Sequence, residues 1–219
     1  ALKHPNIVTI HSIEESGGTH FITMELVEGK VLTELITPEG ISLERFLEIA
    51  IPLADAVSSA HAKGVIHRDL KPANVMLDDQ ERIKVLDFGL AKLSMSSSPD
   101  GEETASLAAP LTQAGSLLGT LAYMSPEQIT GSIVDGRSDI FALGVMFHEL
   151  LGGVRPFRGE HPAVIVYAIV NEAAPRLDSR LGAVTILVER CLHKAPQERF
   201  ASAGELCTAL RNLARPAGT

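Results

Sequence analysis

The chain reads Val65-Ile66-His67-Arg68-Asp69-Leu70-Lys71-Pro72-Ala73-Asn74-Val75-Met76-Leu77 in the stretch that decides its fold. The leading pair Val65-Ile66 is β-branched, and Pro72 prevents a helix from continuing. An apolar run resumes at Val75-Met76-Leu77. The stretch is therefore predicted to form a turn followed by a short strand.

Three side chains on this turn have the types that phosphoryl transfer needs. The carboxylate of Asp69 is suited to orient an attacking hydroxyl and accept its proton. The ammonium group of Lys71 is suited to steady the transferring group, and the amide oxygen of Asn74 to help hold Mg²⁺. The alternative interpretation is a polar turn that contains an Asp and a Lys without chemical purpose.

A second motif follows in Asp87-Phe88-Gly89, directly after the alternating run Ile83-Lys84-Val85-Leu86. The pattern predicts a strand that delivers the Asp87 carboxylate onto a glycine turn, where it suits a second Mg²⁺ ligand. An isolated D-x-G is a common turn and means little. Its position after the first motif makes the combination specific.

Together the two motifs resemble the eukaryotic-type protein kinase family, and the lysine in His-Arg-Asp-Leu-Lys-Pro is typical of its serine/threonine branch. Met-Ser-Pro-Glu-Gln, later in the chain, looks like the bacterial members. The resemblance implies an α+β, protein-kinase-like fold with a mainly α-helical large lobe and a remnant of the β small lobe. It divides the chain into a small-lobe remnant over 1–27 and a large lobe over 28–215, with an activation segment over 87–127.

The resemblance also implies an activity. The expected function is a serine/threonine protein kinase catalytic domain that transfers the γ-phosphoryl group of ATP to protein hydroxyls, with ATP and Mg²⁺ as cofactors. Adenine is expected against main-chain groups of Glu25 and Val27, with Met24 behind it and Met76 below it. For Met24 and Met76, ordinary core packing is the alternative.

Regulation is expected around Arg68, whose guanidinium can accept a phosphate and order the activation segment. The candidate phosphorylation sites are Thr112, Ser116 and the cluster from Ser94 to Ser98. The stretch from Ser94 to Ala109 is predicted to be a mobile loop because it is rich in Ser, Ala, Pro and acidic residues. The alternative for Arg68 is a purely structural ion pair.

Further residues gain roles from the family pattern. Thr120 is expected to bond Asp69 and Lys71, and Asp139 to accept backbone N–H groups of the catalytic turn. Glu127 is expected to be a buried acid that pairs with Arg199. Structural roles are also expected for His67, Phe88 and Gly89.

Hydrophobic periodicity predicts the remaining elements. Ser42 to Gly64 is expected to be an amphipathic helix kinked at Pro52, and a buried apolar helix is expected to open at Asp135. Ser125-Pro126 suits a helix start. Strands are expected at Ile7 to Glu14 and Thr19 to Leu26, and further helices at Pro162 to Asn171, Leu181 to Cys191 and Ser202 to Leu213.

Composition narrows the function classes. Of the 219 residues, 45% are hydrophobic and 21% charged, as in globular domains, and a net charge of −8 argues against a nucleic-acid partner. Cys191 and Cys207 lack metal or redox spacing and are expected to be buried. No apolar run is long enough to span a membrane, so a cytoplasmic location is expected.

One part of the family pattern is missing from these 219 residues. They contain no glycine-rich loop, no lysine of the third small-lobe strand and no regulatory-helix glutamate. The chain is therefore expected to be an N-terminally truncated kinase domain with little activity alone. The alternatives are a pseudokinase-like scaffold, which the retained Asp69, Lys71, Asn74 and Asp87 disfavour, and a small-molecule phosphotransferase, which Thr120 and Arg199 disfavour.

Overall fold

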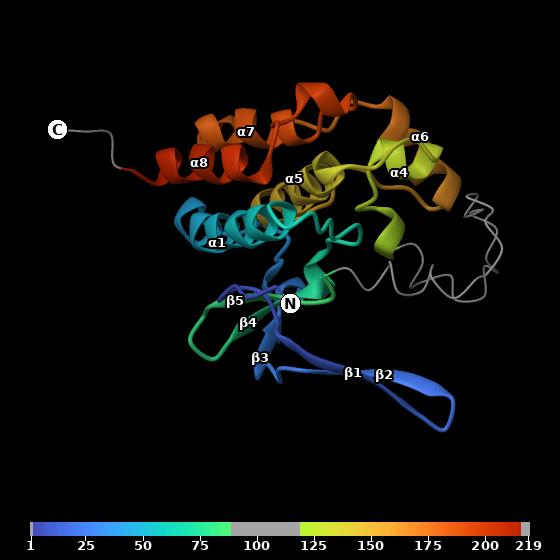
Figure 1. Ribbon diagram of the computed structural model, residues 1–219. Helices are drawn as coiled ribbons and strands as arrows, with labels where there is room; N and C mark the ends of the chain where they lie inside the picture. Colours follow the sequence, from blue (N-terminus) through green and yellow to red (C-terminus); the bar gives the residue numbers. More distant parts are fainter. Residues whose placement is uncertain (1, 89–118, 216–219) are drawn as a thin grey trace.

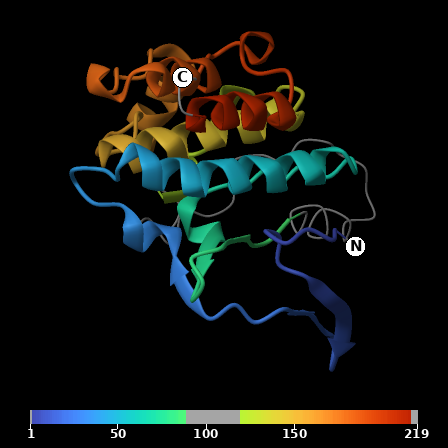
Figure 2. The ribbon, with the colours of Figure 1, turned by 90° about the vertical axis from the view of Figure 1, so that its left-hand side faces the viewer.

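The computed structural model describes residues 2–88 and 119–215 (Figure 1). The predictions for Gly89, Thr112, Ser116 and the 94–109 loop lie outside these residues. The described chain is mainly helical, with two small sheets, and this confirms the expected α+β class. In two perpendicular views, helix α1 (Leu43–His61) lies between the strands and helix α8 (Ala203–Ala214) (Figures 1 and 2).

The first sheet is an antiparallel hairpin of β1 (Ile10–Ser16) and β2 (Thr19–Met24), joined by Gly17 and Gly18 at positive φ. The expectation of a first strand from Ile7 was wrong by three residues. The Val8 N–H donates to the Val85 carbonyl at 2.9 Å, so this end of the chain joins the second sheet instead.

The second sheet has the order β3-β4-β5 and is antiparallel throughout. It contains the two predicted strands, β4 (Val75–Asp78) and β5 (Ile83–Val85), together with β3 (Gly29–Val31), which the sequence did not reveal. Gly29 adopts φ 152°, and a Cβ there would lie 1.9 Å from the Leu77 carbonyl oxygen. Glycine is therefore what lets β3 approach β4.

Helix α5 (Gly136–Gly152) forms the centre of the core, and almost all its residues are buried. It begins where the Asp135 side chain accepts the Arg137 N–H at 2.8 Å. Its Phe147 meets Phe46 of α1 edge to face, with ring centroids 5.1 Å apart. This contact joins α1 and α5 into one hydrophobic cluster.

Helix α1 is capped by Ser42, whose hydroxyl accepts the Arg45 N–H at 3.2 Å, and its helical residues continue through Pro52. The helix predicted from Leu181 to Cys191 is present but begins two residues later, because Gly182 at φ 63° separates the preceding 3-10 turn from α7. The other short elements are α4 (Pro126–Thr130), α6 (Pro162–Asn171), α7 (Ala183–Cys191), and the 3-10 turns η1 (Leu32–Leu35), η2 (Pro72–Asn74), η3 (Ser179–Leu181) and η4 (Pro196–Glu198).

Both cysteines are buried and free, as expected. Burial raises the pKa of both thiols, so neither is a reactive thiolate at neutral pH. Among residues 2–88 and 119–215, no helix has the length and apolar character that crossing a membrane requires.

Candidate functional site

The polar turn after α1 is held in a strained conformation by one buried carboxylate. Arg68 adopts φ 69°, which is uncommon for a residue with a side chain. Asp139, in the first turn of α5 and only 1% exposed, accepts the His67 N–H at 2.8 Å and the Arg68 N–H at 2.9 Å. His61 Nε2 lies 2.8 Å from the same carboxylate. The core helix therefore sets the shape of the turn.

Asp69, Lys71 and Thr120 meet on the outer side of this turn. Lys71 Nζ donates to Asp69 Oδ2 at 2.8 Å and to Thr120 Oγ1 at 2.9 Å. The Asp69 side chain remains 43% exposed, so it faces both a cation and the surrounding solvent. A carboxylate in this setting is oriented and open to an incoming hydroxyl group.

Asn74 lies next to Asp69, and its side-chain NH₂ group is bonded to that residue. Its Nδ2 donates to the Asp69 carbonyl at 2.8 Å and to Asp69 Oδ2 at 3.2 Å. The amide oxygen is thereby left as an acceptor beside a carboxylate.

Asp87 is brought to the same place by its neighbour in the chain. The Leu86 N–H donates to the Asn74 carbonyl at 2.9 Å, and His67 Nε2 lies 2.8 Å from the Leu86 carbonyl. Asp87 itself is exposed and adopts φ 59°, so the chain turns immediately after the strand. The residue before Asp87 is thus bonded on both sides to the polar turn.

The His67 side chain connects the polar turn to the segment around Asp87. The Asp69 N–H faces His67 Nδ1 at 3.3 Å, so Nδ1 is the acceptor and Nε2 carries the proton donated to Leu86. Phe88 packs against the imidazole edge to face, with ring centroids 4.7 Å apart. Both motifs are therefore bound to one ring.

Glu127 and Arg199 form a buried ion pair behind the site. The two terminal guanidinium nitrogens of Arg199 donate to the two carboxylate oxygens of Glu127 at 2.7 and 2.8 Å, and the Ser138 hydroxyl also donates to Glu127. Burial alone would raise the pKa of Glu127, but the bonds from Arg199 and Ser138 outweigh it and lower the pKa. The pair links α4 to the segment before α8.

The residues expected around adenine lie at the end of β2, just after it, and in β4. Met24 ends β2 and is 38% exposed, so it is not packed in the core of the described structure. The Glu25 N–H donates to the Thr9 carbonyl, and its carboxylate accepts Lys84 Nζ; this bond lowers the pKa of Glu25. Val27 is half-buried, and Met76 lies half-buried in β4.

The side-chain oxygens of Asp87 and Asn74 fit a Mg²⁺ ion whose remaining ligands are phosphate and water oxygens. Mg²⁺ in nucleotide sites usually takes one or two protein oxygens together with phosphate and water oxygens. Asp87 supplies an exposed carboxylate, and Asn74 an amide oxygen. No group of three His, Cys, Asp or Glu side chains that would enclose a metal by itself was found in residues 2–88 and 119–215.

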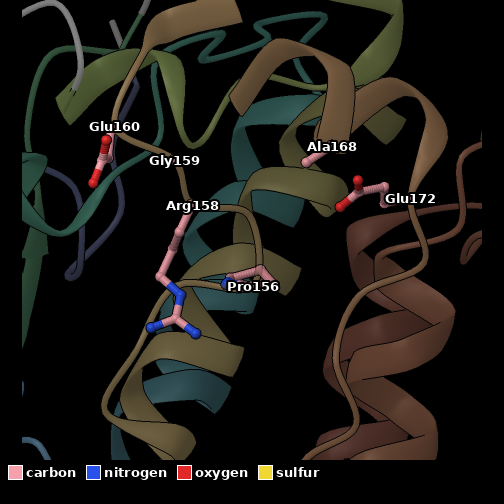
Figure 3. Close-up of a pocket in the computed structure, with 6 residues that line it drawn as sticks. All are labelled: Pro156, Arg158, Gly159, Glu160, Ala168 and Glu172. Carbon is pink, nitrogen blue, oxygen red and sulfur yellow. The ribbon is translucent and has the colours of Figure 1, made fainter. Parts of the chain in front are cut away.

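A separate hollow lies away from these residues, between the loop after α5 and helix α6 (Figure 3). Its wall combines Arg158 and Glu160 of the loop with Ala168 and Glu172 at the end of α6. None of the residues predicted from the sequence lines it.

Two residues near the polar turn were not predicted from the sequence: His61, which contacts the Asp139 carboxylate, and Gln128, which contacts the turn itself. Gln128 donates from Nε2 to the Arg68 carbonyl at 2.7 Å. A signal for Gln128 exists, because Ser125-x-x-Gln128 is a capping-box pattern that places the glutamine in the first turn of α4. No local pattern distinguishes His61, which depends on the position of α5.

Comparison with known proteins identifies relatives. The protein kinase domain model matches residues 1–210. A probable serine/threonine-protein kinase of Clostridium acetobutylicum is 33% identical over 217 residues, which cover 97% of this chain and 31% of the relative. The serine/threonine-protein kinase PknB of Mycolicibacterium smegmatis is 35% identical over 215 residues, 94% of this chain and 33% of that protein. The chain spans about a third of the length of these curated relatives.

Proposed function

Since this chain belongs to the protein kinase domain family, among relatives that are bacterial serine/threonine kinases, we propose that it transfers the γ-phosphoryl group of ATP to serine or threonine hydroxyls of a protein substrate. The observation that carries the proposal is the arrangement around Asp69. Lys71 and Asn74 contact Asp69 directly, Thr120 contacts Lys71, and Asp87 follows a residue bonded to Asn74.

Each residue takes a role that its contacts allow. Asp69 orients the substrate hydroxyl and accepts its proton, while Lys71 neutralises charge on the transferring group. Thr120 holds Lys71 toward Asp69. Asn74 and Asp87 bind Mg²⁺, which supplies neutralisation of the phosphate charge when it is bound.

Nucleotide binding is proposed along the end of β2. The Glu25 carbonyl and Val27 main chain bind the adenine edge, Met24 lies behind the ring and Met76 lies below it. ATP binding implies a location with access to the cytoplasmic ATP pool.

Activation is proposed through Arg68. Its main chain is held by Asp139, so its guanidinium is presented from a rigid position to a phosphate on Thr112 or Ser116. Mass spectrometry of an active preparation should find one of these residues phosphorylated, and an unmodified 89–118 segment in a fully active form would contradict the assignment.

Two alternatives have less support. A scaffold without chemistry does not require Asp69, Lys71, Asn74 and Asp87 together around one turn. A small-molecule phosphotransferase does not explain the contact of Thr120 with Lys71 or the buried Glu127–Arg199 pair, which the family pattern associates with protein substrates.

The test is incorporation of labelled phosphate into a generic protein substrate, with Asp69→Asn as the inactive variant. Removing one preorganised catalytic contact typically lowers kcat by about 10²–10³-fold. Asp87→Asn should weaken Mg²⁺-dependent nucleotide binding, whereas Asp69→Asn should leave that binding within about twofold. Equal incorporation by wild type and Asp69→Asn would refute the proposal.

We also propose that the 219 residues alone are weakly active, because they contain no glycine-rich loop and no lysine equivalent to that of the third small-lobe strand. Those parts cover and align the phosphates. The comparison is between the purified 219-residue chain and the complete product of its reading frame. Full activity of the short chain would remove this part of the proposal and leave the kinase assignment intact.

A further inference from the structure

The side-chain amide of Gln128 makes two hydrogen bonds, one as an acceptor and one as a donor. Its Oε1 accepts the Ser125 N–H at 3.0 Å, which completes the capping box of α4, and its Nε2 donates to the Arg68 carbonyl at 2.7 Å. Both contacts agree on one orientation of the amide, since a flipped amide would place donor against donor and acceptor against acceptor. One side chain therefore joins the start of α4 to the polar turn, 60 residues away in the sequence.

The Arg68 carbonyl belongs to the peptide group that carries the Asp69 N–H. This N–H faces His67 Nδ1 at 3.3 Å, so Gln128 and His67 hold the two ends of the same peptide plane. The preceding peptide is held by Asp139 through the Arg68 N–H at 2.9 Å. With φ of Arg68 at 69°, the turn needs such bonds on both sides to keep its conformation.

We propose that Gln128 is a positioning residue for phosphoryl transfer, which sets the orientation of Asp69 through the Arg68–Asp69 peptide. This inference rests on the proposed function. It gives α4 a part in the chemistry, because a displacement of the start of α4 rotates the peptide that bears the catalytic carboxylate. Helix α4 begins at Pro126, within the segment 87–127 that is expected to respond to phosphorylation. Gln128 thereby couples the end of that segment to Asp69.

Two substitutions separate the bridge from the helix cap. Gln128→Glu keeps an oxygen that accepts the Ser125 N–H, since glutamate serves equally in a capping box, but it loses the donor to Arg68. Ser125→Ala removes the hydroxyl that accepts the Gln128 N–H at 3.3 Å and leaves both side-chain contacts of Gln128 in place. The first variant breaks the bridge alone, and the second weakens the cap alone.

The experiment measures kcat and the KM for ATP in the active form of the enzyme, together with the thermal midpoint of each variant. Gln128→Glu is expected to lower kcat about tenfold, the equivalent of one hydrogen bond, and to leave the KM for ATP within about twofold. Ser125→Ala is expected to lower the thermal midpoint and to keep the wild-type kcat. The proposal is overturned if Gln128→Glu retains the wild-type kcat, or if Ser125→Ala loses as much kcat as Gln128→Glu.

A second measurement does not depend on activity. In ¹⁵N-labelled protein, the Arg68 and Asp69 amides should exchange with solvent at least severalfold faster in Gln128→Glu than in wild type or Ser125→Ala. Unchanged exchange contradicts the positioning role. A wild-type protein without phosphoryl transfer would instead refute the proposed function, while the exchange result would still report on the bridge. Gln128→Met, which removes both polar ends, serves as the second variant if Gln128→Glu does not fold.

Discussion

The Glu127 carboxylate and the Arg199 guanidinium are 72 residues apart in the sequence and bind each other through two parallel hydrogen bonds, with side-chain exposures of 5% and 0%. Arg199 also donates to the backbone carbonyls of His193, Arg137 and Lys194. One buried side chain thus ties α4, the start of α5 and the segment after α7 together.

Removal of Arg199 should be severely destabilising. Arg199→Ala leaves the Glu127 carboxylate buried without its partner, which typically costs about 3–5 kcal/mol in the free energy of unfolding. Urea denaturation measures the loss. Arg211→Ala, which breaks a largely exposed pair with Asp55, is the matched control and should cost less than about 1 kcal/mol. Similar losses in the two variants would contradict the importance of the buried pair.

The Glu127 pair should also make stability depend on acid pH. The pKa of Glu127 in the folded protein lies below its ordinary value of 4.5, because the bonds from Arg199 and Ser138 outweigh burial. The unfolded chain therefore binds more protons near pH 4, and the stabilisation present above pH 4.5 is lost as the pH falls through the folded pKa. Glu127→Gln should show a shallower loss of unfolding free energy between pH 5 and 3 than wild type. Parallel curves would contradict the assignment.

Thr120 should affect turnover through its hydroxyl group. Thr120→Val keeps the shape but removes the oxygen that accepts Lys71 Nζ at 2.9 Å, so kcat is expected to fall about tenfold. Thr120→Ser keeps the hydroxyl and should retain most of the activity. Steady-state kinetics in the active enzyme distinguish the two, and equal effects of both substitutions would show that the hydroxyl is not what matters.

Replacing Asp139 by asparagine should destabilise the protein and distort the polar turn. In Asp139→Asn, an NH₂ group replaces an oxygen that accepts N–H groups, so one donor of the polar turn faces another donor. We expect a loss of about 1–3 kcal/mol in unfolding free energy, together with reduced kcat. Asp135→Asn, on the same helix, is the control: asparagine caps as well as aspartate and should change stability by only a few tenths of a kcal/mol.

Lys194 should give stability a dependence on alkaline pH. Burial, together with repulsion from Arg199, lowers the pKa of Lys194 from 10.5 to about 8. Between these values the unfolded chain holds the proton that the folded protein has released, so the unfolding free energy rises with pH. The difference between wild type and Lys194→Met should therefore grow in favour of wild type from pH 8 to 10.5. A constant difference would contradict the lowered pKa.

Much of the site was predictable from local sequence because its chemistry is concentrated on two short motifs. Asp69, Lys71 and Asn74 lie on one turn, and the strand before Asp87 showed clear alternation. The position of Thr120 and the partnership of Glu127 with Arg199 came from the family resemblance alone, since no local pattern connects residues so far apart in the chain.

What escaped prediction depends on tertiary context or on weak local signals. Strand β3 has three residues, too few for a period to show, and its pairing with β4 depends on the close approach at Gly29. Gly182 interrupts an apolar pattern that otherwise reads as one helix, because its positive φ ends the preceding turn. The second contact of Gln128 arises only when α4 packs against the polar turn.

The burial of Asp139 in the first turn of α5 has a consequence for how the protein unfolds on heating. The same helix supplies the middle of the hydrophobic cluster and the carboxylate that shapes the polar turn. Because Asp139 holds two N–H groups of the turn, we expect the turn to lose its conformation only when α5 unpacks. Activity and near-ultraviolet circular dichroism should accordingly disappear together, over the same few degrees.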